Sequence, residues 1–192
     1  MFIKEKKLFN KTVSVFYKKH GRHDLPWRQT TDPYKILVSE IMLQQTQVSR
    51  VLEKYKQFLK AFPTAKRLAQ APQAEVLILW SGLGYNRRAR FLHQCATELL
   101  SYKTFPTEVP VLEKLPGIGH YTARAVATFA FNQPHVFIET NIRTVFVHHF
   151  FPKRKVVSDA DILKLVERTL DTKNPRHWYS ALMDYGSYLK SQ

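Results

Sequence analysis

Apolar residues follow a helical repeat along nearly the whole chain, and this repeat restricts the fold more than any other feature. Phe9, Val13 and Tyr17 are one example, and the intervals are mostly three or four residues. The strict alternation typical of a half-buried strand is scarce. The ten prolines stand near the ends of the periodic runs and not inside them. The sequence therefore predicts an all-α protein of about ten short helices.

Residues suited to helix N-termini mark several of the expected starts. Asp32-Pro33 combines a capping side chain with a residue that fits the first turn, and Asn174-Pro175 repeats the pattern. Ser158 is followed three residues later by Asp161, in the manner of a capping box. Further helices are expected from residue 48 to the Phe62-Pro63 pair, from 64, over 72–80, 86–100 and 119–131, and from 140.

Charge and cysteine content narrow the class of protein. Thirty Lys and Arg against fifteen Asp and Glu leave a formal net charge of +15, which indicates a polyanionic partner such as nucleic acid or an anionic membrane surface. The longest segment without a charged residue, 125–138, is too short and polar to span a bilayer, and the N-terminus lacks a signal-peptide core. The single cysteine, Cys95, excludes an internal disulfide and a four-cysteine site. We expect a cytoplasmic monomer without membrane contact.

The strongest local motif is Leu115-Pro116-Gly117-Ile118-Gly119-His120-Tyr121-Thr122-Ala123. A Gly-x-Gly turn here leads into a helix of small residues, and the free N–H groups of such a turn can bind a phosphate oxygen. The contact would position a duplex without reading its sequence. The segment resembles the helix-hairpin-helix of DNA-binding proteins, which often holds a monovalent cation; the alternative is a plain helix–helix corner. The residues expected at DNA here are Gly117, Gly119, His120 and Thr122.

Further segments line up in order with one protein family. They are Leu25-Pro26-Trp27-Arg28, Asp32-Pro33-Tyr34-Lys35, Ser39-Glu40-Ile41-Met42-Leu43-Gln44-Gln45-Thr46, Gly82-Leu83-Gly84-Tyr85 and Ile138-Glu139-Thr140-Asn141-Ile142. Over about residues 25 to 190 the chain resembles the HhH-GPD superfamily of DNA glycosylases, and within it the MutY-type adenine glycosylases. The resemblance implies a two-lobed fold: a six-helix lobe with the hairpin at 28–132, and a second helical lobe from 1–27 and 133–192. Double-stranded DNA with a flipped base would bind across the cleft.

The chemistry implied by the resemblance needs an acid that protonates the leaving base and a carboxylate that stabilises the oxocarbenium-like sugar. Glu40 suits the first role, because its apolar neighbours Ile36, Leu37, Ile41 and Leu43 can keep a carboxyl protonated near neutral pH. The alternative is a glutamate on a solvated face. Glu139 stands where the family has an aspartate facing the sugar. Because a displacement of about 1 Å can slow a reaction on the order of a hundredfold, the protein is expected to have a repositioned site, or to be slow, altered in substrate or inactive. Alternatively, Glu139 is a first-turn acid favoured by the helix dipole.

Other positions are assigned by the same resemblance. Tyr121 occupies the hairpin position where bifunctional relatives carry a Schiff-base lysine, and a phenol cannot form an imine, so a monofunctional enzyme is expected. Arg28 and Asn141 match polar residues that hold the pocket and orient the acids. The alternatives are that Tyr121 packs on the core, that Arg28 is a surface arginine and that Asn141 is an amide at a helix N-terminus.

Residues of two loops are expected to meet the duplex. Gln45 and Tyr85 resemble the wedge that enters the base stack, since planar groups replace lost stacking at modest entropy cost. Thr46 and Leu83 would lie beside the opposite base. Arg87 and Arg88, with the basic residues Arg90, Lys153, Arg154 and Lys155, are expected at phosphates, although runs of charge are often solvated faces.

The sequence also departs from the family. Four cysteines usually hold a [4Fe–4S] cluster at the end of this domain, but here Lys190 stands near the position of the first. We therefore expect no cluster and no other cofactor, apart from a monovalent cation at the hairpin. The resemblance also leads us to expect a chain without the C-terminal domain with which such relatives check for 8-oxoguanine, which puts specificity for that lesion in question. The expected function is monofunctional removal of a mispaired or damaged base, most of all adenine opposite 8-oxoguanine or guanine. A bifunctional glycosylase/AP lyase and a catalytically weak lesion-binding protein remain alternatives, while generic RNA binding explains only the charge.

Overall fold

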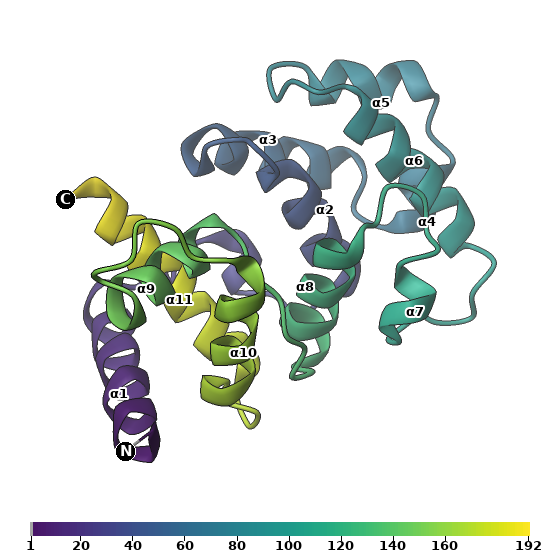
Figure 1. The fold of residues 1–192 in the computed structure, drawn as a ribbon. Coiled ribbons are helices and arrows are strands. Elements are labelled where there is room, and N and C mark those ends of the chain that lie inside the picture. The colour runs from purple at the N-terminus through teal and green to yellow at the C-terminus, as the bar shows by residue number, and fades with distance from the viewer. Residues whose placement is uncertain (1) are drawn as a thin grey trace. The chain divides into compact units, whose positions relative to one another are not determined.

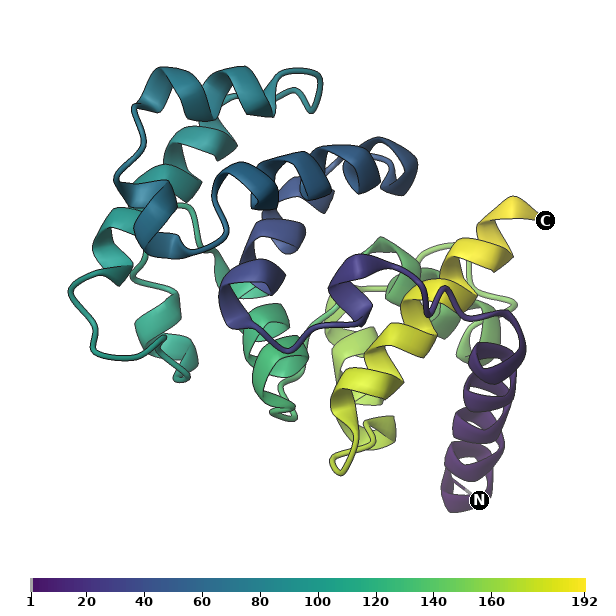
Figure 2. The same cartoon turned by 180° about the vertical axis from the view of Figure 1, so that it is seen from behind.

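The computed structural model describes residues 2–192, and the secondary structure over this range is helical, without a strand (Figures 1 and 2). The prediction of an all-α protein is confirmed. The chain divides into two compact units: Asp24–Phe131 forms one, and the chain up to His23 with Asn132–Gln192 forms the other. These boundaries lie close to those expected after residues 27 and 132.

The unit Asp24–Phe131 begins with a 3-10 turn and continues with seven α-helices. They are η1 (Pro26–Arg28), α2 (Pro33–Leu43), α3 (Val48–Ala61), α4 (Ala65–Ala69), α5 (Gln73–Trp80), α6 (Arg87–Leu99), α7 (Val109–Leu112) and α8 (His120–Phe131). The sequence predicted six of the α-helices and missed α7. Its four residues are too few to show a periodic pattern, and Pro110 lies in its first turn, where proline is tolerated.

Helix α2 forms the centre of this unit and packs against α3 and α8. Asp32 caps it as predicted: one carboxylate oxygen accepts hydrogen bonds from the backbone N–H groups of Tyr34 at 2.9 Å and Lys35 at 3.2 Å. Eight residues from Tyr34 to Met42 are buried, all but Lys35 in that stretch. Because the helix is buried on nearly all sides, it carries an ionisable residue, Glu40, into the interior.

Cys95 lies in α6 and is completely buried. Burial raises the pKa of its thiol to about 12, and the nearby carboxylate of Glu98 adds to the rise. The thiolate is therefore a minor species at neutral pH, and we expect the native thiol to be unreactive.

The second unit contains α1 (Phe2–His20), α9 (Thr140–Phe150), α10 (Asp159–Thr169) and α11 (Pro175–Ser191). Helix α11 packs between α1 and α9, with which it makes most of its contacts (Figure 1). Ser158 accepts a hydrogen bond from the backbone N–H of Asp161 at 3.1 Å, which confirms the predicted cap of α10. Asp184 on α11 is buried and accepts two hydrogen bonds from the Arg22 guanidinium and one from its backbone N–H. The segment after α1 is thereby joined to α11.

Helices α9 and α11 approach each other closely where glycine replaces a side chain. A Cβ added at Gly186 would lie 2.2 Å from the carbonyl oxygen of Asn141, far inside normal contact distance. The absence of that carbon lets α11 lie directly against the N-terminal turn of α9. No helix in the described range 2–192 is long and apolar enough to cross a membrane.

Candidate active site

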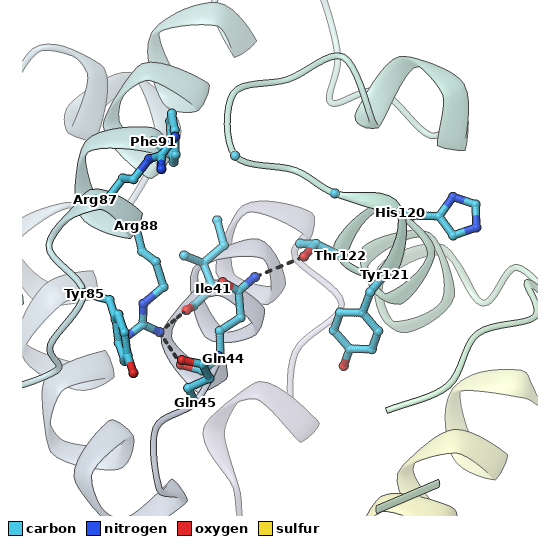
Figure 3. Close-up of a pocket in the computed structure, with 12 residues that line it drawn as sticks. Ile41, Gln44, Gln45, Tyr85, Arg87, Arg88, Phe91, His120, Tyr121 and Thr122 are labelled. Atoms are coloured by element: carbon cyan, nitrogen blue, oxygen red, sulfur yellow. Dashed lines mark hydrogen bonds between the residues drawn. The ribbon is translucent and has the colours of Figure 1, made fainter. Parts of the chain in front are cut away.

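A hollow of about 830 Å³ opens beside the hairpin in the unit Asp24–Phe131 (Figure 3). Its volume is within the range of small-ligand pockets, roughly 300–1,000 Å³. The end of α2, the start of α6 and the hairpin with the start of α8 supply its lining. The lining residues are Ile41, Gln44, Gln45, Tyr85, Arg87, Arg88, Phe91, Gly117, Gly119, His120, Tyr121 and Thr122. Nine of these twelve were predicted as site residues, so the structure brings most of the predicted set in this unit together.

Glu40 and Tyr121 meet at this place, although 81 positions separate them in the sequence. The Tyr121 hydroxyl donates a hydrogen bond to Oε2 of Glu40 at 3.1 Å. Glu40 is only 7% exposed, which rules out the alternative of a solvated glutamate. A buried carboxyl held by a tyrosine on the pocket wall is suited to controlled proton transfer.

The two hairpin glycines have different environments. Gly117 has a left-handed φ of 76°, and a Cβ there would lie 2.5 Å from Cβ of Phe91. Gly117 is therefore required by the packing of the protein itself. At Gly119 a Cβ would meet no atom within 4 Å, so its backbone is open to approach from outside.

His120 begins α8 and is turned away from the other lining side chains (Figure 3). Its Nδ1 lies 2.9 Å from the Glu113 carboxylate, which also accepts a hydrogen bond from Arg124 at 2.8 Å. The His120 side chain is 74% exposed, so it remains accessible beside the hairpin.

Two residues that the sequence assigned to DNA have buried side chains. Thr122 is 2% exposed, and its hydroxyl accepts a hydrogen bond from the Gln44 side chain at 3.2 Å. Leu83 is 3% exposed, and its carbonyl accepts hydrogen bonds from the Thr46 hydroxyl at 3.4 Å and from Arg88 Nη2 at 3.0 Å. Both side chains are buried, although Thr122 still contributes to the wall of the hollow.

The two wedge residues share an unusual backbone conformation. Gln45 and Tyr85 have φ values of 53° and 49°, in the left-handed region that residues other than glycine rarely adopt. Both are exposed, and both line the hollow. Such strained positions persist when the surrounding structure holds them, and they are concentrated at functional sites.

The predicted arginines have three different settings. The Arg28 guanidinium lies 5.8 Å from the Phe129 ring centroid, and that of Arg87 lies 4.9 Å from the Phe91 centroid. Arg88 was expected at a phosphate, but its guanidinium donates hydrogen bonds to backbone carbonyls and to the Thr46 hydroxyl. Its terminal nitrogens are therefore occupied within the protein.

Glu139 and Asn141 lie at the start of α9, in the second unit. Glu139 is the N-cap itself: its Oε1 accepts hydrogen bonds from the backbone N–H groups of Asn141 and Ile142, both at 2.8 Å. Its Oε2 accepts from the Asn141 side-chain amide at 3.2 Å. Lys190 on α11 donates to Oδ1 of Asn141 at 2.9 Å, which turns the amide nitrogen toward Glu139.

Sequence reasoning missed four residues of these sites. Ile41, Gln44 and Phe91 line the hollow, and Lys190 holds Asn141. Phe91 follows Arg87 by four positions, which places both on one face of a helix, so helical spacing could have identified it. Lys190 carried no signal, because its partner is far away in the sequence.

These geometries agree with the comparison of the chain with known proteins. The profile of the HhH-GPD superfamily of base excision DNA repair proteins matches residues 38–170. The chain belongs to this superfamily. It is 36% identical over 189 residues to an adenine DNA glycosylase of Buchnera aphidicola subsp. Baizongia pistaciae, covering 95% of this chain and 53% of the relative. It is 42% identical over 173 residues to the adenine DNA glycosylase of Mycolicibacterium smegmatis, covering 88% of this chain and 59% of the relative.

This HhH-GPD chain thus spans little more than half the length of these relatives. A solved structure of a thermostable thymine-DNA glycosylase has the same fold, with a TM-score of 0.85 and 26% sequence identity over 97% of this chain and 88% of that chain. The family's usual iron–sulfur cluster needs four cysteines, and the residues present do not fit it. Cys95 is the one cysteine of the chain, and it is buried in α6.

Proposed function

We propose that this chain is a monofunctional DNA glycosylase of base excision repair that releases adenine opposite 8-oxoguanine or guanine. The observation that carries the proposal is the buried Glu40 carboxyl, hydrogen-bonded to Tyr121 on the wall of a hollow beside the hairpin. Membership of the superfamily and the names of the relatives support the same reaction.

In the proposed reaction, Glu40 donates a proton to a ring nitrogen of the flipped purine as the bond from that base to C1′ breaks. Water then adds to C1′ and releases a proton, so that the products are the free base and an abasic site. Tyr121 orients the acid. The charge of Glu139 is assigned to the oxocarbenium-like sugar, and Asn141 holds that carboxylate through its amide.

DNA binding in the proposal uses the hairpin and the two loops. The open backbone at Gly119 takes a phosphate, with a monovalent cation beside it, and Gln45 and Tyr85 replace the flipped base in the stack. The net charge of +15 supplies the attraction that does not depend on sequence.

The test is single-turnover base excision on duplexes with A:8-oxoG, A:G, T:G and U:G pairs. Glu40→Gln should lower the rate of adenine release by at least about a hundredfold, the lower range for loss of a general acid. Glu53→Gln, at an exposed site on α3, is the charge-matched control and should retain the wild-type rate. If all four duplexes stay intact while the wild type binds them, the enzyme proposal is wrong. Full activity in Glu40→Gln would reject Glu40 as the acid.

A second candidate substrate is thymine in a T:G pair. The solved protein of TM-score 0.85 is a thymine-DNA glycosylase, and its 26% identity to this chain favours including this reaction. Thymine release that exceeds adenine release would establish this candidate in place of the first.

The bifunctional alternative is tested separately by borohydride trapping on a duplex with an abasic site. Tyr121 at the hairpin position cannot form an imine, so no adduct should be trapped. A covalent protein–DNA adduct would show that another amine of the chain acts as a nucleophile.

A further inference from the structure

We infer that Arg88 is the positioning residue that holds both wedge loops, 44–46 and 83–85, in the conformation that meets DNA. The inference rests on the proposed function in one respect, namely that Gln45 and Tyr85 enter a damaged duplex. It replaces the expected role of Arg88 at a phosphate.

The guanidinium of Arg88 divides its contacts between two separate parts of the chain. Its Nη1 donates to the carbonyl oxygens of Ile41 at 2.7 Å, Met42 at 3.2 Å and Gln44 at 2.6 Å. Its Nη2 donates to the carbonyls of Leu83 at 3.0 Å and Gly84 at 3.2 Å, and to the Thr46 hydroxyl at 3.1 Å. Figure 3 shows the contacts of Arg88 with Ile41 and Gln44.

The carbonyls of Gln44 and Gly84 belong to the residues directly before the two wedge residues, Gln45 and Tyr85. A peptide unit is planar, so a hydrogen bond to its oxygen also fixes the orientation of the following N–H. The peptide units that enter Gln45 and Tyr85 are therefore held by two nitrogens of one rigid group. This restraint accounts for the left-handed backbone of Gln45 and Tyr85, each of which follows one of the held peptide units and would otherwise relax to a common conformation.

The positive charge of Arg88 is favoured by the dipole of α2 and disfavoured by the dipole of its own helix, α6. Arg88 stands in the first turn of α6, where the helix dipole disfavours a cation. The carbonyls that its Nη1 contacts lie at the C-terminal end of α2, which lacks intrahelical donors and attracts positive charge. The side chain therefore compensates for the end of the helix that carries Glu40.

Two aromatic rings lie beside the Arg88 guanidinium. The Arg88 Cζ lies 5.5 Å from the ring centroids of both Trp80 and Tyr85, and the Trp80 indole donates to the Gly84 carbonyl at 3.1 Å. The Nε of Arg88 is buried and has no hydrogen-bond partner within the described part of the chain, so the two terminal nitrogens make the hydrogen bonds of the group. A lysine has the same charge but no planar fork, and one ammonium cannot bridge both loops.

The test is Arg88→Lys, with Arg67→Lys at an exposed site on α4 as the matched control. The readout is the ratio of affinities for a duplex with a tetrahydrofuran abasic analogue and for the undamaged duplex, measured over a range of salt concentrations. This ratio requires binding but no base release. Arg88→Lys should lower the ratio at least about tenfold, as expected for loss of one stacking contact, while Arg67→Lys keeps it.

The salt dependence separates positioning from phosphate binding. A phosphate contact contributes about 0.9 to the slope of log affinity against log salt, so Arg88→Gln would lower the slope by that amount in the phosphate role. We expect an unchanged slope and a lowered ratio. A lowered slope with the wild-type ratio would overturn the inference, as would wild-type behaviour of Arg88→Lys.

A double-mutant cycle tests whether Arg88 acts through the wedge. In a background of Gln45→Ala and Tyr85→Ala, Arg88→Lys should have little further effect on the ratio, because the residues that it positions are gone. Additive effects would overturn the inference.

If Arg88→Lys does not fold, Thr46→Val takes its place, since it removes one acceptor of the Arg88 guanidinium at nearly constant volume. A severalfold lower ratio supports the inference and a wild-type ratio overturns it.

The two proposals fail in different ways. If no duplex loses a base but the ratio depends on Arg88, the glycosylase proposal fails and the positioning role stands. If bases are released at the wild-type rate by Arg88→Lys and the ratio is unchanged, the positioning role fails while the glycosylase proposal stands.

Discussion

The cap that Glu139 provides and the catalytic charge that we propose for it can be tested separately, because its two oxygens have different partners. Oε1 accepts from two backbone N–H groups and caps α9, while Oε2 faces the Asn141 amide. The extra methylene relative to aspartate is accommodated by the cap, and the oxygen next to Asn141 is the one assigned to the sugar. The sequence offered Glu139 as an acid in the first turn of a helix. It lies one position before that turn, at the N-cap of α9.

Glu139→Gln should keep the backbone cap and remove activity, at a loss of roughly 0.3–1 kcal/mol of stability from the missing charge at the N-terminus of α9. An amide oxygen can still accept the two backbone hydrogen bonds, but the negative charge is lost, so adenine release should fall at least about a hundredfold. Glu139→Ala removes the cap as well and should lower the free energy of unfolding by about 1 kcal/mol. Urea unfolding and single-turnover excision measure the two effects. Equal activity of wild type and Glu139→Gln would exclude a catalytic charge here.

The hairpin glycines offer a second pair of contrasting substitutions. Gly117→Ala places a Cβ against Phe91 at a left-handed position, so it should lower the free energy of unfolding by roughly 1–3 kcal/mol. Gly119→Ala meets open space and should leave the unfolding midpoint unchanged while weakening binding to duplex DNA. Thermal unfolding and a binding titration check both. A stable Gly119→Ala protein with full affinity would show that no phosphate approaches this backbone.

At the level of residues, the predictable part of the site is the part carried by local motifs. Tyr121 and Glu40 were each identified within a short segment, and the structure brings them into contact. The roles of Arg88 and Lys190 depend on which distant carbonyl or amide lies near, and spacing within a motif contains no such information. The contact of the Thr122 hydroxyl with Gln44 could not be read from the motif, because a threonine after a hairpin looks the same whether it faces solvent or α2.

The crossing of α9 and α11 depends on one missing side chain. Gly186→Ala would drive a Cβ into the Asn141 carbonyl, and the N-terminal turn of α9 would have to move. We expect the free energy of unfolding to fall by about 3 kcal/mol, the upper part of the range for overpacking. Ser187→Ala, the next residue along α11, is the control, and urea denaturation is the measurement. A loss below about 0.5 kcal/mol, typical of a neutral surface change, would mean that the helices separate easily.

At the level of elements, helix starts were more predictable than helix number. Asp32 and Ser158 cap α2 and α10 through their own side chains, and such a signal lies within four residues of sequence. Helix α7 gave no comparable signal, because four residues around a proline cannot display a period. Its existence follows from packing against α8, which is a tertiary contact.

At the level of the whole molecule, acid should destabilise the fold through two histidines. Burial lowers the pKa values of His149 and His177, helped by the neighbouring His148 and His23, respectively, while Asp171 opposes the shift at His177. In the folded state each ring therefore binds its proton less readily than in the unfolded chain, whose ordinary value is 6.5. Stability is complete above that value and is lost as the pH falls through the folded-state pKa.

His149→Gln should therefore flatten the decline of stability between about pH 7 and pH 5. The Tyr185 hydroxyl, 3.1 Å from Nε2 of His149, keeps a partner in the glutamine amide. Thermal unfolding midpoints at several pH values give the comparison, and Arg90→Gln serves as a surface control. An equally steep decline in His149→Gln would assign the acid sensitivity to other groups.

The buried thiol of Cys95 has a practical consequence for spectroscopy. Since it is the one cysteine of the chain and is enclosed in α6, a cysteine introduced on the surface would be the sole site open to a maleimide dye or a nitroxide. The native residue need not be replaced first. A probe attached beside either wedge loop could then report whether that loop moves when duplex DNA is added.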